Sequence, residues 1–168
     1  MAAEKEQRND RLIYWGVVLL GLAFILGGLV MAYQGWHTRQ EVTQDLLNEK
    51  LEVEDPATLL TYPDARAPEG VEVPTVTIDA AQEAHDQSMV IRTHTLASTG
   101  GKTYSEMDRE DPGRALYITS LTLQNSLHQA HLGLEITKLV IGMGVAFTGL
   151  GLGILVLGAP LTRKVLGL

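Results

Sequence analysis

The fold of this chain is decided by LIYWGVVLLGLAFILGGLVMAY at residues 12–33 and by LVIGMGVAFTGLGLGILVLGAPL at residues 139–161. Neither stretch contains a charged residue, and each is longer than the roughly 20 residues that a helix needs to cross a bilayer. A mostly polar segment, residues 34–138, lies between them. The sequence therefore predicts an all-α membrane protein with two transmembrane helices. Its expected partners include the lipid bilayer.

Basic residues beside the two stretches predict the orientation of the chain. Cytoplasmic flanks of membrane spans are enriched in lysine and arginine. Five such residues lie on the terminal sides of the stretches: Lys5, Arg8, Arg11, Arg163 and Lys164. We therefore expect both termini in the cytoplasm of a bacterial cell. The predicted parts are a cytoplasmic tail at 1–11, a transmembrane helix at 12–33, an extracytoplasmic helical domain at 34–138, a transmembrane helix at 139–161 and a cytoplasmic tail at 162–168.

A cleaved signal peptide is the alternative for the first stretch. Val30, Met31 and Ala32 fit the small-residue pattern of a cleavage site. However, the apolar run is much longer than the roughly 7–15 residues of a signal peptide. We expect a retained anchor and keep removal of residues 1–32 as the alternative.

The composition of the middle segment excludes several functions. It contains 8 lysine and arginine residues against 17 aspartate and glutamate residues, and the chain contains no cysteine. An acidic domain binds nucleic acid poorly, so no nucleic-acid partner is expected. Without cysteine there is no disulfide, zinc-thiolate site, iron–sulfur cluster or thiol nucleophile.

Proline and glycine divide the middle segment into elements. We predict a short strand within 71–78, a helix at 79–99 that ends at Gly100-Gly101, and one long helix at 112–158. The alternative for the long helix is a break near Gly133 or within the glycine-rich apolar stretch. The first helix continues beyond the apolar stretch, so that three helices form a small extracytoplasmic bundle. Its expected core residues are Leu46, Leu51, Ala84, Ile91, Leu116, Leu123 and Leu127.

Small residues form a stripe on each apolar helix when it is drawn at 100° per residue. Lipid-facing positions do not require small side chains, whereas close helix packing does. We therefore predict that the stripes face protein, either each other or neighbouring copies. The predicted helix-packing residues are Gly16, Ala23 and Gly27 on the first helix, and Gly142, Ala146, Gly149 and Gly153 on the second.

The polar continuation of the second stripe contains the candidate metal ligands His128, His131 and Glu135. Two imidazoles and a carboxylate on one helical face suit a transition metal. The three residues span nearly two turns, so a metal site would also need a ligand from another helix, such as His85, His94 or His37. The alternative is a solvated or helix-packing face with no cofactor, in which Glu135 pairs with Lys138.

The segment from His94 to Gly151 carries a family resemblance. It contains TLASTGGKTYSEM at residues 95–107, followed by Asp111-Pro112 and the glycine-rich second apolar stretch. In these features the chain resembles a group of uncharacterised bacterial two-span membrane proteins, some of which are named aromatic ring-opening dioxygenases. The resemblance implies the two-span plan and supplies no catalytic residues. A ring-opening dioxygenase requires a preorganised non-haem iron site, usually of two histidines and a carboxylate. The histidines of this sequence are scattered.

These observations predict a non-catalytic structural or accessory subunit that scaffolds or stabilises a larger membrane assembly. Its partners would be copies of itself or other membrane subunits. One alternative is an extracytoplasmic metal- or ligand-binding protein that uses His128, His131 and Glu135. Another is a small oligomeric channel, although Thr148 is the single polar side chain that the second apolar stretch offers before Thr162.

Overall fold

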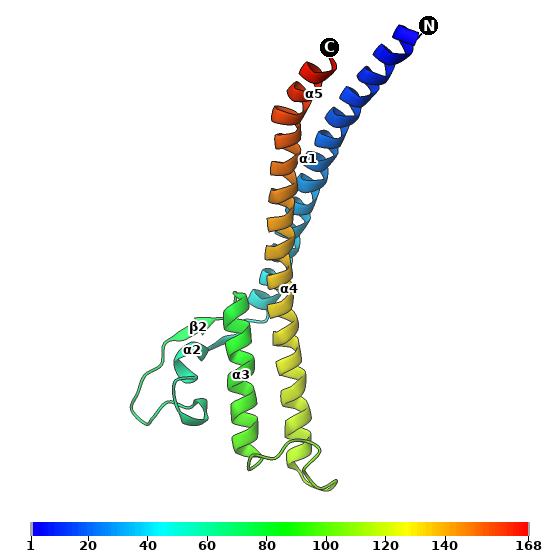
Figure 1. The fold of residues 1–168 in the computed structure, drawn as a ribbon. Helices are drawn as coiled ribbons and strands as arrows, with labels where there is room; N and C mark the ends of the chain where they lie inside the picture. Colours follow the sequence, from blue (N-terminus) through cyan, green and yellow to red (C-terminus); the bar gives the residue numbers. More distant parts are fainter. Residues whose placement is uncertain (1, 168) are drawn as a thin grey trace. The chain divides into compact units, whose positions relative to one another are not determined.

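The structure is a computed structural model that describes residues 2–167, with residues 2–7 as backbone alone. It is mostly helical, and two of its helices are long and apolar enough to cross a membrane. Met1 and Leu168, at the ends of the predicted tails, lie outside the described residues. In chain order the elements are α1 (Ala2–Asn48), β1 (Glu52–Glu54), α2 (Pro56–Leu59), η1 (Pro63–Ala65), β2 (Thr75–Thr77), α3 (Ala81–Ser98), α4 (Gly113–Gly153), η2 (Ile154–Gly158) and α5 (Ala159–Leu166) (Figure 1).

The chain forms two compact units. The first, which we call the apolar hairpin, comprises the described residues up to Thr38 and from Thr137 onward. The second, the middle domain, is Arg39–Ile136. The divisions fall inside α1 and α4, near the limits of residues 34–138 that the sequence predicts.

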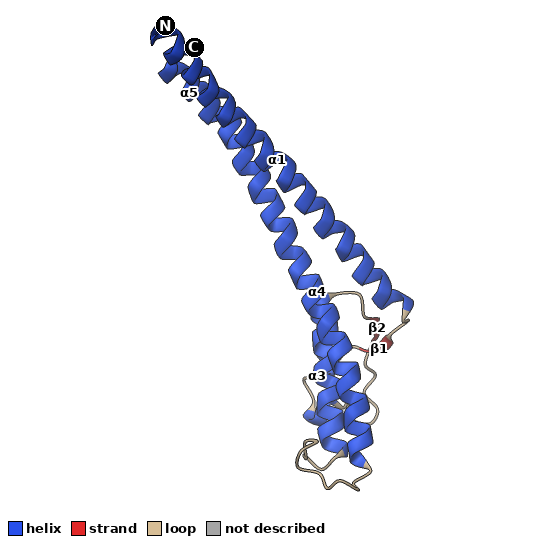
Figure 2. Ribbon diagram, turned by 90° about the vertical axis from the view of Figure 1, so that its right-hand side faces the viewer, coloured by secondary structure: helices blue, strands red, loops and turns tan. Residues whose placement is uncertain are grey.

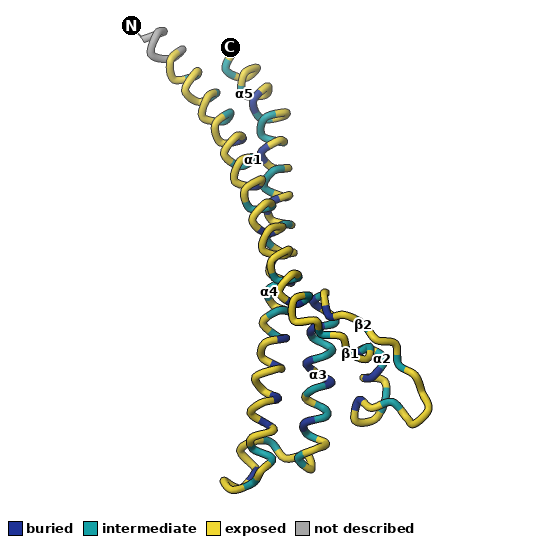
Figure 3. The backbone as a smooth tube through the Cα atoms, turned by 180° about the vertical axis from the view of Figure 1, so that it is seen from behind, coloured by how far each residue is buried: buried dark blue, intermediate teal, exposed yellow. Residues whose placement is uncertain are grey.

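The apolar hairpin leaves most of its surface uncovered. In the most apolar window of each long helix, only 11% of the residues are buried. Exposed residues follow both helices along their length (Figure 3). The core helix of a soluble protein would be covered on most sides, so the two helices need a further apolar environment.

The second helix of the hairpin changes its geometry near its end. α4 ends at Gly153 and is followed by the π-helical turn η2, in which the Ala159 N–H donates to the Ile154 carbonyl. Pro160 has no N–H and collides with the carbonyl four residues before it, so the regular hydrogen-bond pattern cannot pass through it. The helix predicted up to Gly158 is therefore regular only to Gly153.

In the middle domain, α3 and α4 lie side by side (Figures 1 and 2). The helix predicted at 79–99 is confirmed as α3, which ends at Ser98, just before Gly100 and Gly101, which both have positive φ. The last turns of α1 complete the core together with Ile78, the residue after β2. This core consists of Leu46, Ile78, Ala81, Ala84, Leu127 and Leu134.

Two of the predicted core residues are wrong. Leu116 is 47% exposed and Leu123 is 52% exposed, whereas the other five are buried in the core or pack at its edge. Leu46 of α1 belongs to the same core cluster as Leu127 of α4. Because α1 ends at Asn48, it does not continue along α4 far enough to cover the two exposed leucines.

A short pair of strands joins the end of α1 to the start of α3 (Figure 2). β1 and β2 pair antiparallel, with Val53 opposite Val76. The strand predicted within 71–78 is confirmed as β2, whereas β1 was not predicted. At three residues each, the strands are too short to show an alternating pattern that sequence reasoning can recognise.

Asp55 caps the short helix α2. Its carboxylate accepts hydrogen bonds from the Thr58 N–H at 3.1 Å and from the Thr58 hydroxyl at 2.5 Å. The hydrogen bond from the Thr58 side chain, followed by those from the Thr58 and Ala57 backbone, holds the pKa of Asp55 below its ordinary value against the opposing effect of desolvation. The cap is therefore a charged carboxylate at neutral pH.

The Thr58→Val variant is expected to raise the pKa of Asp55 toward the ordinary carboxyl value, because it removes the hydroxyl donor. The folded-state pKa lies below the unfolded one, so this group stabilises the fold above the ordinary pKa and loses that effect as pH falls through the lower value. An NMR titration of Asp55 measures the change. Thr61→Val is the control, since the Thr61 hydroxyl donates to the Thr58 carbonyl. An unchanged Asp55 pKa in Thr58→Val would contradict the assignment.

Candidate functional site

Glycines at intervals of seven hold the apolar hairpin together. Buried glycines recur at residues 21, 28 and 35 on α1, and at residues 144 and 151 on α4. We call these five the glycine seam: Gly21, Gly28, Gly35, Gly144 and Gly151. A seven-residue repeat keeps one face of each helix against its partner, as in a left-handed coiled coil.

The two backbones approach closely along the glycine seam. A methyl carbon added to Gly28 would lie 2.5 Å from the Gly144 carbonyl oxygen and 2.6 Å from the Thr148 nitrogen. A methyl carbon added to Gly151 would lie 2.5 Å from the Gly21 carbonyl oxygen. Such distances are too short for any side chain, so the approach depends on glycine. The pairing of Gly28 with Gly144 and of Gly21 with Gly151 shows that the helices are antiparallel.

The predicted small-residue stripes lie elsewhere on the same helices. Within the described residues, a methyl carbon added at any of their five glycines would meet no atom within 4 Å. Ala23 and Ala146 are also exposed. The two stripes therefore do not pack against each other, and this part of the expectation is wrong. The five glycines are Gly16, Gly27, Gly142, Gly149 and Gly153. Contact of the stripes with neighbouring copies or other proteins stays a prediction.

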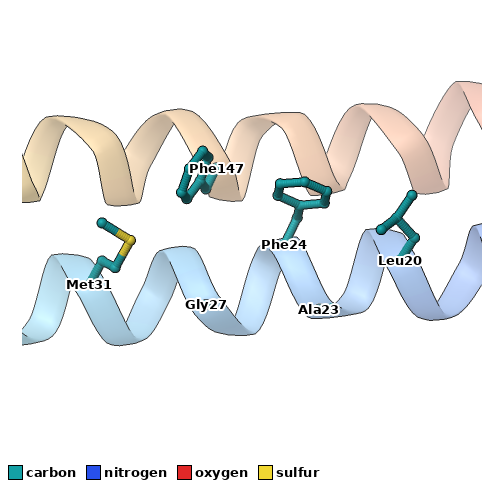
Figure 4. Close-up of a pocket in the computed structure, with 6 residues that line it drawn as sticks. All are labelled: Leu20, Ala23, Phe24, Gly27, Met31 and Phe147. Carbon is teal, nitrogen blue, oxygen red and sulfur yellow. The ribbon is translucent and has the colours of Figure 1, made fainter.

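An open apolar groove of about 400 Å³ runs beside part of the first stripe (Figure 4). Ala23 and Gly27 leave space between larger neighbours on α1, and Phe147 reaches the groove from α4. The rings of Phe24 and Phe147 meet edge to face with centroids 5.7 Å apart. Its full lining is Leu20, Ala23, Phe24, Gly27, Met31 and Phe147.

Thr148 lies beside the glycine seam, and its hydroxyl makes a hydrogen bond within α4. The hydroxyl donates to the Gly144 carbonyl of its own helix at 2.8 Å. The side chain is placed over Gly28, where there is room for it because that residue has no side chain. A threonine that is bonded in this way serves helix packing.

Two of the candidate metal ligands have defined hydrogen-bonding states in the middle domain. The His128 Nδ1 lies 2.9 Å from the Gln124 carbonyl oxygen, and the His131 Nδ1 lies 2.9 Å from the Ala81 carbonyl oxygen. Since a carbonyl oxygen only accepts, each Nδ1 carries the hydrogen. When either ring is neutral, its lone pair is therefore on Nε2.

His85 of α3 is the residue that the structure brings to these two histidines. Its ring centroid lies 5.0 Å from that of His131 and 5.8 Å from that of His128. Its Nδ1 is buried and makes no hydrogen bond among the described residues. Of the three second-helix candidates that the sequence offered, His85 is the one that joins the pair.

The other two histidine candidates have neighbours of their own. The Nε2 of His94 bonds to the Ala65 carbonyl oxygen at 2.8 Å, and the His37 ring lies beside Tyr33. Glu135 is exposed on α4. Among the described residues, no three histidine, aspartate or glutamate side chains converge closely enough to hold one metal ion. The metal site at His128, His131 and Glu135 stays a prediction.

No protein-family model, curated protein or solved structure matches this chain. The resemblance to the bacterial two-span proteins therefore stays a prediction.

Proposed function

We propose that this chain is a two-span membrane protein with a non-catalytic role, in which it scaffolds or stabilises a larger membrane assembly. It acts as a homo-oligomer or together with other membrane subunits. The observation that carries the proposal is the exposed apolar surface of α1 and α4, since only 11% of the residues in the most apolar window of each helix are buried. Lipid and neighbouring membrane helices are the environments that cover such a surface.

The aromatic residues of α1 support the proposed placement in a bilayer. Trp15 and Trp36 are both 58% exposed, and they stand at the two ends of the apolar stretch. At 1.5 Å per residue they are separated by about 30 Å, the thickness of the hydrocarbon core. Tryptophan at these two levels is typical of membrane interfaces. Together with the basic flanks, this favours cytoplasmic termini and an extracytoplasmic middle domain.

Two separate surfaces support the proposed role in an assembly. The glycine seam joins α1 to α4, so contacts within the chain already hold the hairpin together. The small-residue stripes remain on the outside, and Ala23 and Gly27 border an open groove. Small residues spaced four apart permit a further helix to approach closely. The hairpin is therefore suited to pack both internally and against a neighbour.

The other two functions have less support. For a channel, Thr148 would be the polar group of the second span, and its hydroxyl is bonded to its own helix. For a metal-binding protein, the favourable feature is that His128 and His131 use Nδ1 for backbone carbonyls and that both rings lie beside His85. These rings would have to turn toward a common point before they could ligate one ion.

Membrane fractionation followed by purification in a mild detergent tests the proposed function. The protein is expected to remain in membranes after a high-pH wash and to purify as an oligomer or with other membrane polypeptides, identified by mass spectrometry. A reporter fused to the C-terminus is expected to be active on the cytoplasmic side. Release by the wash, or a monomer that purifies alone, would overturn the proposal.

A further inference from the structure

Basic side chains of α1 and α5 lie at the same end of the apolar hairpin, beside the two ends of the chain (Figures 1 and 2). A methyl carbon added to Gly158 would lie 3.8 Å from the Val17 side chain, so these two residues are neighbours across the hairpin. Because the helices are antiparallel, the residues that follow Gly158 come level with those that precede Val17. We call the exposed basic residues at this height the terminal basic patch: Arg8, Arg11, Arg163 and Lys164.

The terminal basic patch lies just beyond the edge of the hydrocarbon core in the proposed placement. Arg11 precedes Trp15 by four residues, which is about 6 Å along α1. Trp15 marks the membrane interface, and the headgroup layer beyond the hydrocarbon core is about 5–8 Å thick on each side. The terminal basic patch is therefore at the height of the lipid phosphates.

One side of α1 offers hydrogen-bond donors at this height in addition to charge. Arg8, Arg11 and Trp15 lie within an arc of about 60° when the helix is drawn at 100° per residue, and all three are exposed. A guanidinium group binds two phosphate oxygens at once, and an indole N–H is a further donor. A phosphodiester is an acceptor that matches this set of groups.

The charge at this height is positive although the chain as a whole is acidic. The formal net charge of the chain is −7, whereas residues 8–11 and 162–167 contain four basic residues and the single acid Asp10. The opposite end of the hairpin has no such surplus, because Arg39 and Lys138 are matched in number by Glu41 and Glu135. The positive surplus is therefore confined to the end that carries the termini.

We infer that the terminal basic patch binds the phosphate of an anionic phospholipid in preference to a zwitterionic one. A basic segment at the membrane surface is attracted to anionic lipids of the cytoplasmic leaflet. The two helices contribute cations at one height, so one headgroup can be held from both sides. The inference rests on the proposed function, which places this end of the hairpin at the cytoplasmic surface.

Spin-labelled lipids test the inference on the whole chain, reconstituted into phosphatidylcholine bilayers. Electron spin resonance separates lipid held against the protein from free lipid, and comparison of labelled phosphatidylglycerol with labelled phosphatidylcholine gives the preference. The test variant is Arg11→Gln with Lys164→Gln, which removes one cation from each helix. Arg11→Lys with Lys164→Arg keeps both charges, and Arg39→Gln is the matched control at the opposite end. Circular dichroism confirms unchanged helix content.

The natural chain is expected to hold phosphatidylglycerol about fivefold more strongly than phosphatidylcholine, the effect of one additional favourable charge contact at a membrane surface. The double glutamine variant is expected to lose most of this preference, while the charge-conserving variant and Arg39→Gln keep it. Chloride and inorganic phosphate at equal ionic strength are expected to weaken it equally by screening. Stronger displacement by inorganic phosphate would mean that the patch binds free phosphate, and would overturn the inference.

Two further outcomes separate this inference from the proposed function. If the natural chain holds both labelled lipids equally, or if the double glutamine variant keeps the full preference, the inference fails and the proposed function stands. If the chain holds neither labelled lipid, it is not inserted in the bilayer, and the proposed function fails together with the inference.

Discussion

The Gly28→Leu variant is expected to lose the close packing of the apolar hairpin. Already the first carbon of the side chain would lie 2.5 Å from the Gly144 carbonyl oxygen and 2.6 Å from the Thr148 nitrogen. Both atoms belong to a backbone, which cannot turn aside as a flexible side chain does. The two helices must separate, and overpacking of this kind costs about 1–3 kcal/mol, or more for a large side chain. The free energy of unfolding in mixed detergent micelles measures the loss.

Gly27→Leu is the control for this prediction. It introduces the same side chain one residue away on the same helix, where an added methyl carbon meets no described atom within 4 Å. Its effect on the free energy of unfolding of the monomeric hairpin, with no neighbouring helix on the groove, is expected to stay within about 0.5 kcal/mol, as at other open positions. If the two variants were equally stable, the hairpin would not be held by the glycine seam.

The Ile78→Ala variant is expected to destabilise the middle domain by about 2–5 kcal/mol, the range for truncating a fully buried isoleucine. The Ile78 side chain has no exposed surface, and it lies in the core with Leu46 and Leu127. Its N–H donates to the Leu51 carbonyl, so the neighbouring backbone is held in place and cannot readily close the cavity. Urea titration followed by hydrogen–deuterium exchange in α3 measures the change.

Val71→Ala serves as the matched control, because Val71 belongs to the same connecting segment and is 44% exposed. Its truncation is expected to change the free energy of unfolding by at most about 0.5 kcal/mol. Equal protection of α3 in the Ile78→Ala variant and in the natural chain would show that Ile78 does not support the core.

Local sequence signals predicted the helices well. The pair Gly100-Gly101 ends α3 as expected, since both residues adopt the positive φ that glycine tolerates. The apolar runs without charge predicted both long helices. Leu46 lies in a run of apolar residues at helical spacing on α1. Leu127 lies on α4, and both belong to the same core. These features depend on a few neighbouring residues, and so they can be read from one segment at a time.

Tertiary contacts explain what the sequence did not predict. Gly27 and Gly28 are chemically identical neighbours, yet only Gly28 faces the other helix. Spacing in the sequence does not separate them, because Gly16 and Ala23 of the predicted stripe are seven residues apart just as Gly21 and Gly28 are. Only the contact with α4 does. Likewise, His85 and His94 were equal candidates, and only the pairing of α3 with α4 places His85 beside His131.

A helix contact that depends on the absence of side chains, such as the glycine seam, tolerates no conservative substitution. An apolar core residue such as Leu134 can be replaced by isoleucine or methionine, and neighbouring side chains adjust. At Gly28, Gly144 and Gly151 every possible replacement adds atoms where two main chains already touch. Spontaneous mutation can therefore only loosen these positions, and natural selection can keep them only by removing every variant that arises there.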